Sequence, residues 1–186
     1  MTTRTWLKRI GAGSYLLVLA LVTIHFYRTP IWILDMLGYM GNVRLHDTTE
    51  AVKLHDLVYD ELRSSVPPTA FDNLTGAHDQ NGSEHDRLVN PFHYVEFLPF
   101  FAIRPMYNQT IYLLSRTGIG LVRSVRLISA VCYWLLGVLV LIWLGKHTPL
   151  SPALALLIML MPHITFLGRQ TASDALSVLL VCFRCS

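Results

Sequence analysis

The sequence predicts an all-α integral membrane protein with three transmembrane helices, a truncated fourth helix and a large extracytoplasmic loop. The apolar fraction is 53%, and only 15% of the residues are charged, whereas a soluble domain carries about a quarter charged residues. The charge is also unevenly placed. Three long stretches contain no Asp, Glu, Lys or Arg, while residues 28–126 contain every acid except Asp174. This distribution is typical of a chain that meets both lipid and water.

The first charge-free stretch, residues 10–27, is predicted to cross the membrane. As a helix its 18 residues rise roughly 27 Å, which is enough for the hydrocarbon core. Arg4, Lys8 and Arg9 precede it and predict that residues 1–9 are cytoplasmic. A cleaved signal peptide is the alternative, but no small-residue cleavage site follows the apolar stretch. An uncleaved anchor is therefore preferred.

Residues 28–126 are predicted to form the extracytoplasmic loop. A helix is expected near 47–63, where apolar residues recur at helical spacing, and residues 69–90 have the composition of an irregular surface loop. The segment 91–116 is aromatic-rich and interrupted by prolines. It is expected to form short amphipathic helices that lie along the membrane surface.

The remaining spans follow from the same criterion of missing charge. In chain order they are a second span at 127–144, a cytoplasmic turn at 145–149, a third span at 150–167, an outer turn at 168–173 and an incomplete fourth span at 174–186. About ten apolar residues cannot cross a bilayer. The fourth stretch is therefore interpreted as the start of a helix in a truncated chain.

Several short motifs in the second half of the chain resemble one enzyme family. They are Pro105-Met-Tyr107, Gly118-Ile-Gly120, Arg126-Leu-Ile-Ser129 at the start of a span, and the turn Arg169-Gln-Thr-Ala-Ser-Asp174 followed by Ala-Leu. In this order they resemble the N-terminal third of polytopic GT-C-type glycosyltransferases. The resemblance implies transfer of a sugar from a polyprenyl-phosphate donor on the outer face of a bacterial inner (plasma) membrane. A fragment of that length is expected to be inactive alone.

The family uses a carboxylate soon after the first span to accept a proton from the acceptor hydroxyl. By resemblance Asp47 and Glu50 are the catalytic candidates, and Asp35 is the second choice. The alternative interpretation is structural, because Asp47-x-x-Glu50 is itself a capping-box pattern at a helix start. The sequence departs from the family at these positions, because neither Asp47 nor Glu50 belongs to the adjacent Asp-Glu pair that the family has there.

Cationic residues near the predicted outer interface are candidates for binding the lipid phosphate. Arg104, Arg123 and Arg126 could each grip a phosphate in a bidentate way. The alternatives are contact with ordinary lipid headgroups and pairing with Glu96. Asp174 is interpreted as a helix N-cap, although the resemblance places it near the sugar site. His163, inside the third span, is expected to pack against other helices.

Metal, redox and nucleic-acid chemistry receive little support from the sequence. Four His-Asp dipeptides, at residues 46–47, 55–56, 78–79 and 85–86, lack a third ligand at metal-site spacing and are expected to be solvated. No metal site is assigned, and the involvement of a divalent metal stays open. The terminal Cys182-Phe-Arg-Cys185 has no supporting redox context. A net charge of +3 without a basic run predicts no nucleic-acid partner.

Two further function classes remain open. The first is a non-enzymatic membrane protein whose outer loop binds a ligand or partner. The second is a transporter fragment, which is ranked last because the predicted spans hold few polar residues.

Overall fold

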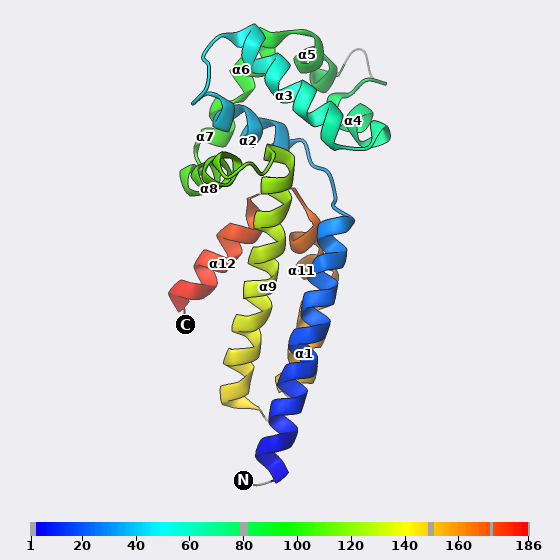
Figure 1. Cartoon of the computed structure of the whole chain (residues 1–186), viewed down its shortest axis with the longest axis vertical. Helices are drawn as coiled ribbons and strands as arrows, with labels where there is room; N and C mark the ends of the chain where they lie inside the picture. The colour runs from blue at the N-terminus through cyan, green and yellow to red at the C-terminus, as the bar shows by residue number, and fades with distance from the viewer. Residues whose placement is uncertain (1–2, 79–81, 149–150, 172, 186) are drawn as a thin grey trace. The chain divides into compact units, whose positions relative to one another are not determined.

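The computed structural model describes residues 3–78, 82–148, 151–171 and 173–185. All regular secondary structure within these ranges is helical, and the one β-type contact is an isolated bridge between Ile31 and Gln170. The chain divides into two compact units. One unit consists of residues 1–31 and 127–186, and the other of residues 32–126 (Figure 1). The predicted all-helical class is confirmed.

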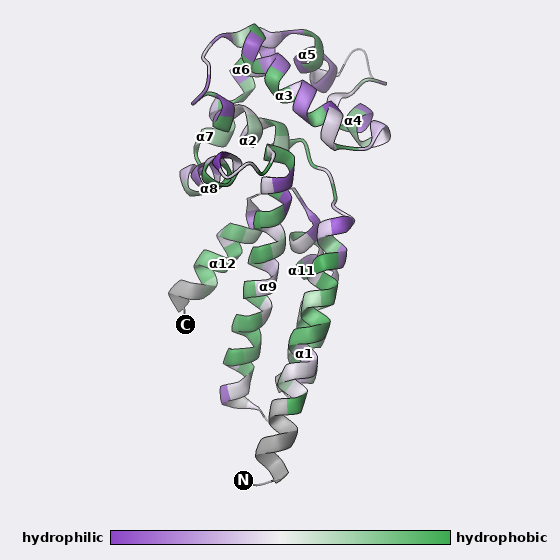
Figure 2. Cartoon of the chain, viewed as in Figure 1, coloured by the Kyte–Doolittle hydropathy of each residue, from purple (hydrophilic) through white to green (hydrophobic). Residues whose placement is uncertain are grey.

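Two helices are long and apolar enough to cross a membrane. They belong to α1 (Thr3–Arg28) and α9 (Leu121–His147), with candidate spans at Ile10–Arg28 and Leu121–Lys146. In Figure 2, hydrophobic residues, coloured green, occupy much of the candidate span of each helix. The structure thus agrees with the predicted first and second spans, because the absence of charge is a local property that the sequence displays directly.

The third predicted span is not one straight helix. It consists of α10 (Ser151–Met159) and α11 (Pro162–Arg169), which meet at a 68° bend and amount to a third span only if the pair is counted as one. The break has a physical cause in Pro162, which lacks an N–H donor and disfavours the helical region for the residue before it. Met161 accordingly has an extended conformation with φ −60° and ψ 139°.

The fourth apolar stretch forms α12 (Asp174–Cys185), a short helix that is not among the candidate spans of the described chain. The prediction of three full spans with a fourth begun is therefore supported only for two helices, or three with the bent pair.

Aromatic and glycine contacts hold the first unit together. Tyr15 of α1 donates a hydrogen bond to the carbonyl of Gly137 at 2.9 Å, and Tyr133 of α9 donates to the carbonyl of Met159 at 2.8 Å. The rings of Phe26 and Tyr133 meet edge to face with centroids 5.2 Å apart. Buried phenol hydroxyls need such partners in an apolar environment, so these contacts position the helices specifically.

The second unit is built from short helices. In chain order they are α2 (Asp35–Arg44), α3 (Ala51–Ser65), α4 (Pro68–Thr75), α5 (Ser83–Val89), α6 (Pro91–Phe97), α7 (Pro99–Ala102) and α8 (Pro105–Arg116). Four of them begin at a proline, which suits the first turn of a helix because its missing N–H would have no intrahelical partner there. The prolines of segment 91–116 thus start helices, where the sequence suggested interruptions.

The expectation of an irregular loop at 69–90 is wrong for the described part of that segment. Helices α4 and α5 occupy most of it, and α4 ends at Gly76, whose φ of 61° is the left-handed conformation that glycine adopts readily. Buried Phe71 and Leu74 secure α4. The polar composition of the segment concealed these helices because α4 buries only a few side chains and α5 buries none.

The core of the second unit lies where α2, α3 and α6 pack together. Tyr94 of α6 is fully buried and donates a hydrogen bond to the carbonyl of Leu37 at 2.8 Å. His55 of α3 stacks on Tyr59 and lies near the Tyr94 ring. This core fixes the relative positions of α2 and α3, which carry the first residues of the site described next.

Candidate functional site

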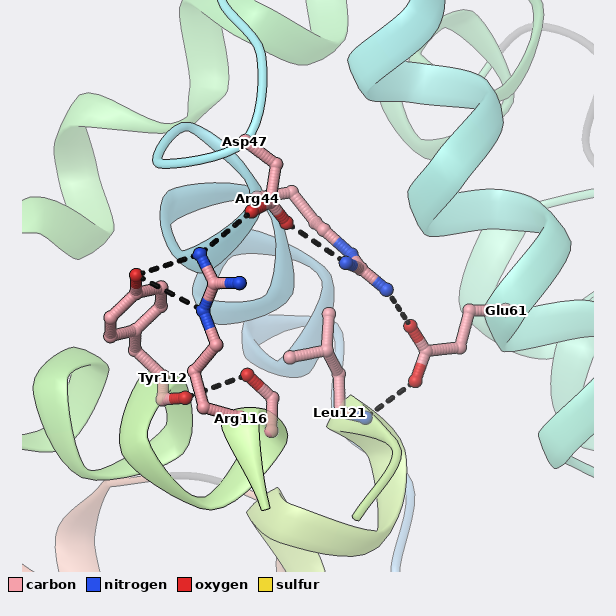
Figure 3. Close-up of polar contacts among 7 residues, drawn as sticks. Arg44, Asp47, Glu61, Tyr112, Arg116 and Leu121 are labelled. Atoms are coloured by element: carbon pink, nitrogen blue, oxygen red, sulfur yellow. Dashed lines mark hydrogen bonds and ion pairs between the residues drawn. The ribbon is translucent and has the colours of Figure 1, made fainter. Parts of the chain in front are cut away.

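A network of ion pairs and hydrogen bonds in the second unit surrounds Asp47. Arg44 is the last residue of α2, and Asp47 lies in the turn that follows it. Glu61 comes from α3, and Tyr112 and Arg116 come from the end of α8. These five residues are called the Asp47 cluster (Figure 3). Packing of both α3 and α8 against α2 brings together segments that lie far apart in the sequence.

Arg44 is the centre of the Asp47 cluster. Its Nη1 donates to Asp47 Oδ2 at 2.9 Å, and its Nη2 donates to Glu61 Oε2 at 2.9 Å. Planar guanidinium groups suit this task because they offer several donors in a fixed geometry. The other oxygen of Glu61 accepts a hydrogen bond from the backbone N–H of Leu121, the first residue of α9. Glu61 therefore joins a guanidinium to a helix start, where a carboxylate is electrostatically favoured.

Arg116 completes the Asp47 cluster on its other side. Its Nη2 lies 3.6 Å from Asp47 Oδ1, and its Nε and Nη2 donate to the Tyr112 hydroxyl at 3.1 and 3.0 Å. The Asp47 carboxylate therefore lies between two guanidinium groups (Figure 3). With two arginines and two carboxylates, the cluster is close to electrically neutral when all four are ionised.

Both arginines are firmly cationic. Burial acts to lower the pKa of Arg44, but its hydrogen bonds to Asp47 and Glu61 and the charges of these carboxylates outweigh burial and raise it. The pKa of Arg116 is raised chiefly by its hydrogen bonds to Tyr112 and also by the charge of Asp47. The site therefore offers an anion two permanent positive charges, which are already paired with the carboxylates of Asp47 and Glu61.

A cavity of about 460 Å³ opens beside the Asp47 cluster. All five cluster residues line it, together with Leu57, Ser115, residues 118–120 before α9 and Leu121 at its start. The side chain of Asp47 is 32% exposed and that of Arg116 is 62% exposed, so both can meet a ligand. Two guanidinium groups, a phenol hydroxyl and a carboxylate can bind a phosphate and accept a proton next to it.

Of the predicted catalytic carboxylates, only Asp47 lies in this site. Glu50 occupies the N-cap position of α3, is exposed and makes no capping hydrogen bond through its side chain. The capping-box interpretation is wrong, because α3 starts at Ala51 and the carboxylate of Asp47 is held by Arg44 and Arg116. Asp35 is the first residue of α2.

The three arginines predicted to bind phosphate contact different partners. Arg104 donates to the Tyr39 hydroxyl at 3.2 Å, and the guanidinium of Arg126 lies over the ring of Trp32 at 5.6 Å. Arg123 is exposed on α9, and Glu96 is exposed on α6. Arg44 and Arg116 are instead the pair that the structure places on either side of a candidate carboxylate.

The His-Asp dipeptides differ from one another in the structure. His55 is buried, and its Nε2 lies 2.9 Å from the carbonyl oxygen of Leu88 and 3.2 Å from that of Arg87. Expecting His55 to be solvated was wrong, because the ring forms part of the core. Asp79 lies outside the described residues. Within the described ranges, no group of three His, Cys, Asp or Glu side chains could hold a metal ion.

Asp174 belongs to the other unit. It is the first residue of α12 and therefore does not occupy the N-cap position that the sequence predicted. Its carboxylate accepts a hydrogen bond from the side chain of the buried Gln170 at 3.0 Å. The expectation that His163 packs against other helices is wrong, since it is exposed near the start of α11.

Sequence reasoning missed four members of the Asp47 cluster. Arg44 could have been found, because it precedes Asp47 by three residues, a spacing that allows an ion pair at a helix end. Glu61, Tyr112 and Arg116 give no local signal, since they reach the site only through tertiary packing.

No protein-family model, no curated protein and no solved structure matches this chain.

Proposed function

We propose that this chain is the N-terminal part of a GT-C-like membrane glycosyltransferase that uses a polyprenyl-phosphate-linked sugar. The observation that carries the proposal is the position of Asp47, a partly exposed carboxylate between two guanidinium groups at the edge of a cavity. The unit that holds this site joins candidate spans at both of its ends. A site built on such a unit suits a substrate that is anchored in lipid.

The arginines and the carboxylate have separate tasks in this proposal. Arg44 and Arg116 bind the phosphate of the donor. The phosphate oxygens replace the Asp47 carboxylate as the acceptors of the arginine hydrogen bonds, and Asp47 is released from its ion pairs. The acceptor hydroxyl oxygen then bonds to the anomeric carbon, and the bond from that carbon to the phosphate oxygen breaks with its electron pair. Asp47 accepts the hydroxyl proton. The lipid phosphate leaves with its charge stabilised by both arginines.

The location of the site is part of the same proposal. The N-terminus lies in the cytoplasm, the second unit faces outward from the bacterial inner membrane, and the donor reaches the site from the outer leaflet. The basic residues before the first span support this orientation.

Binding and transfer test the proposal separately. Purified chain in proteoliposomes is given a panel of radiolabelled polyprenyl-phosphate-linked hexoses. Arg44→Gln and Arg116→Gln should each weaken binding at least about tenfold, because each variant loses charge-assisted hydrogen bonds to the phosphate. Arg63→Gln is the matched control, because Arg63 is an exposed arginine on α3 whose guanidinium lies over the ring of Phe71.

Asp47→Asn should keep binding and abolish transfer in any longer polypeptide that contains this chain. Absence of binding to every donor in the panel, in this chain and in the longer polypeptide, would refute the proposed activity.

A second candidate function is a non-enzymatic membrane protein whose second unit binds a ligand or partner. The observation in its favour is that Arg44 and Arg116 already engage the Asp47 carboxylate in the structure, as in a purely structural ion-pair network. The triple variant Asp35→Ala, Asp47→Ala and Glu50→Ala discriminates the two functions. Full function in that variant favours the binding protein.

A further inference from the structure

Large apolar side chains are exposed on the last helices of the second unit. Phe100 of α7, Ile103 just after it, and Met106 and Leu113 of α8 are between 61% and 77% exposed. These four residues are called the α7–α8 face. Surface apolar residues of this size, gathered within one short segment, mark a contact surface in most soluble proteins.

The exposure is selective within this segment. The rings of Phe101 and Tyr107, which alternate with the exposed residues, both pack edge to face against Tyr39 of α2. Helix α8 buries Tyr107 and Ile111 and presents Met106 and Leu113 away from that core, as expected for an amphipathic helix. The α7–α8 face therefore does not belong to the core of its own unit.

Charge distinguishes this face from the rest of the unit. Acidic residues occur throughout residues 35–96, but none occurs between Phe97 and Ser173. The segment from α7 to the end of α8 contains Arg104, which precedes α8, and Arg116, its last residue, and no acid. Apolar side chains flanked by cations are the composition of a segment that binds an anionic lipid surface.

The second unit is connected at both of its ends to helices that are candidate membrane spans. The second unit begins at Trp32, four residues after the first candidate span ends at Arg28, and ends at Arg126, within the second. Both ends of the unit are thus held near the headgroups.

We infer that the α7–α8 face lies on the bilayer surface, with Phe100, Ile103 and Met106 in the headgroup region and Arg104 among the lipid phosphates. The inference goes beyond the proposed function and holds for an enzyme or a binding protein alike. Because α8 also carries Tyr112 and Arg116, contact of this helix with lipid fixes the distance of the Asp47 cluster from the membrane.

Depth-dependent quenching of a fluorescent probe tests the inference in the full chain. Cys132, Cys182 and Cys185 are replaced by Ser, and an environment-sensitive probe is attached at Ile103→Cys. The matched control is Val52→Cys, an exposed apolar position on the acid-bearing helix α3. Both proteins are reconstituted in vesicles of equal parts phosphatidylcholine and phosphatidylglycerol, and retention of fold is checked by helical circular dichroism.

The probe at 103 should be quenched by lipids that carry a nitroxide near the headgroup and protected from iodide present on both sides of the bilayer. The probe at 52 should show the reverse. Equal behaviour of the two probes would overturn the inference. So would protection from iodide at 103 without quenching by lipid, because that result means that protein covers the face.

Discussion

Glu61 is the residue on which the shape of the site depends most. One of its oxygens binds Arg44, and the other accepts the N–H at the start of α9. Its side chain is only 16% exposed, so its charge must be balanced by partners. Asp47 is more exposed and can exchange its partners for a ligand. Glu61 is therefore the structural carboxylate of the site, and Asp47 is the candidate catalytic one.

Replacing Glu61 with Gln should therefore destabilise the second unit. The amide keeps an acceptor for Leu121 but loses the ion pair with Arg44, and we expect the free energy of unfolding to fall by about 1 to 2 kcal/mol. Denaturant unfolding in detergent micelles measures this loss. Asp60→Asn, at an exposed neighbouring position, should change stability by less than about 0.5 kcal/mol. Equal effects of the two variants would contradict the role assigned to Glu61.

At the scale of elements, prolines and glycines determine how the helices begin, break and pack. Pro91, Pro99 and Pro105 each start a helix in the second unit, whereas Pro162 separates α10 from α11. The same residue type thus has two effects, which depend on whether an N–H is needed at that position.

Gly168 allows close packing of α11 in the first unit. A Cβ atom placed there would lie 2.7 Å from a ring carbon of Tyr133 and 3.0 Å from one of Phe26. Gly168→Ala should cost roughly 1 to 3 kcal/mol through overpacking, measured as a lower unfolding midpoint in detergent. Gly13→Ala is the control, since no atom lies within 4 Å of its added Cβ. An unchanged midpoint for Gly168→Ala would show that α11 does not pack there.

Pro162→Ala should straighten the bent pair of α10 and α11. With the missing donor restored and Met161 free to become helical, a continuous helix would separate residues 154 and 166 by roughly 18 Å along its axis. Spin labels at these exposed positions should move further apart in the variant, as measured by pulsed electron paramagnetic resonance. Pro152→Ala, in the first turn of α10, should leave the distance unchanged. Equal distances between the spin labels in the two variants would mean that tertiary contacts, and not Pro162, cause the bend.

At the scale of the whole molecule, the chain alternates between two environments. Its candidate spans are nearly free of charge, while the intervening unit holds most of the acids. This alternation predicts that the second unit and the turn after α9 lie on opposite sides of the membrane.

Labelling of single cysteines in intact cells tests that arrangement. In a cysteine-free background, a membrane-impermeant maleimide should react with Lys53→Cys on α3 before lysis and with Lys146→Cys, near the end of α9, only after lysis. Both positions are exposed, so access to the reagent decides the result. The opposite pattern would reverse the orientation, and loss of the chain from membranes after a carbonate wash would contradict membrane insertion itself.

The sequence by itself determined the helical class and the two candidate spans, because length and missing charge are local properties that lipid selects directly. It also singled out Asp47. Only the tertiary structure decided that Glu61 and Arg116 join Arg44 and Asp47 in one network, while Glu50 stays outside it. Glu61 and Arg116 come from α3 and α8, and contacts between distant segments depend on packing that no local pattern records.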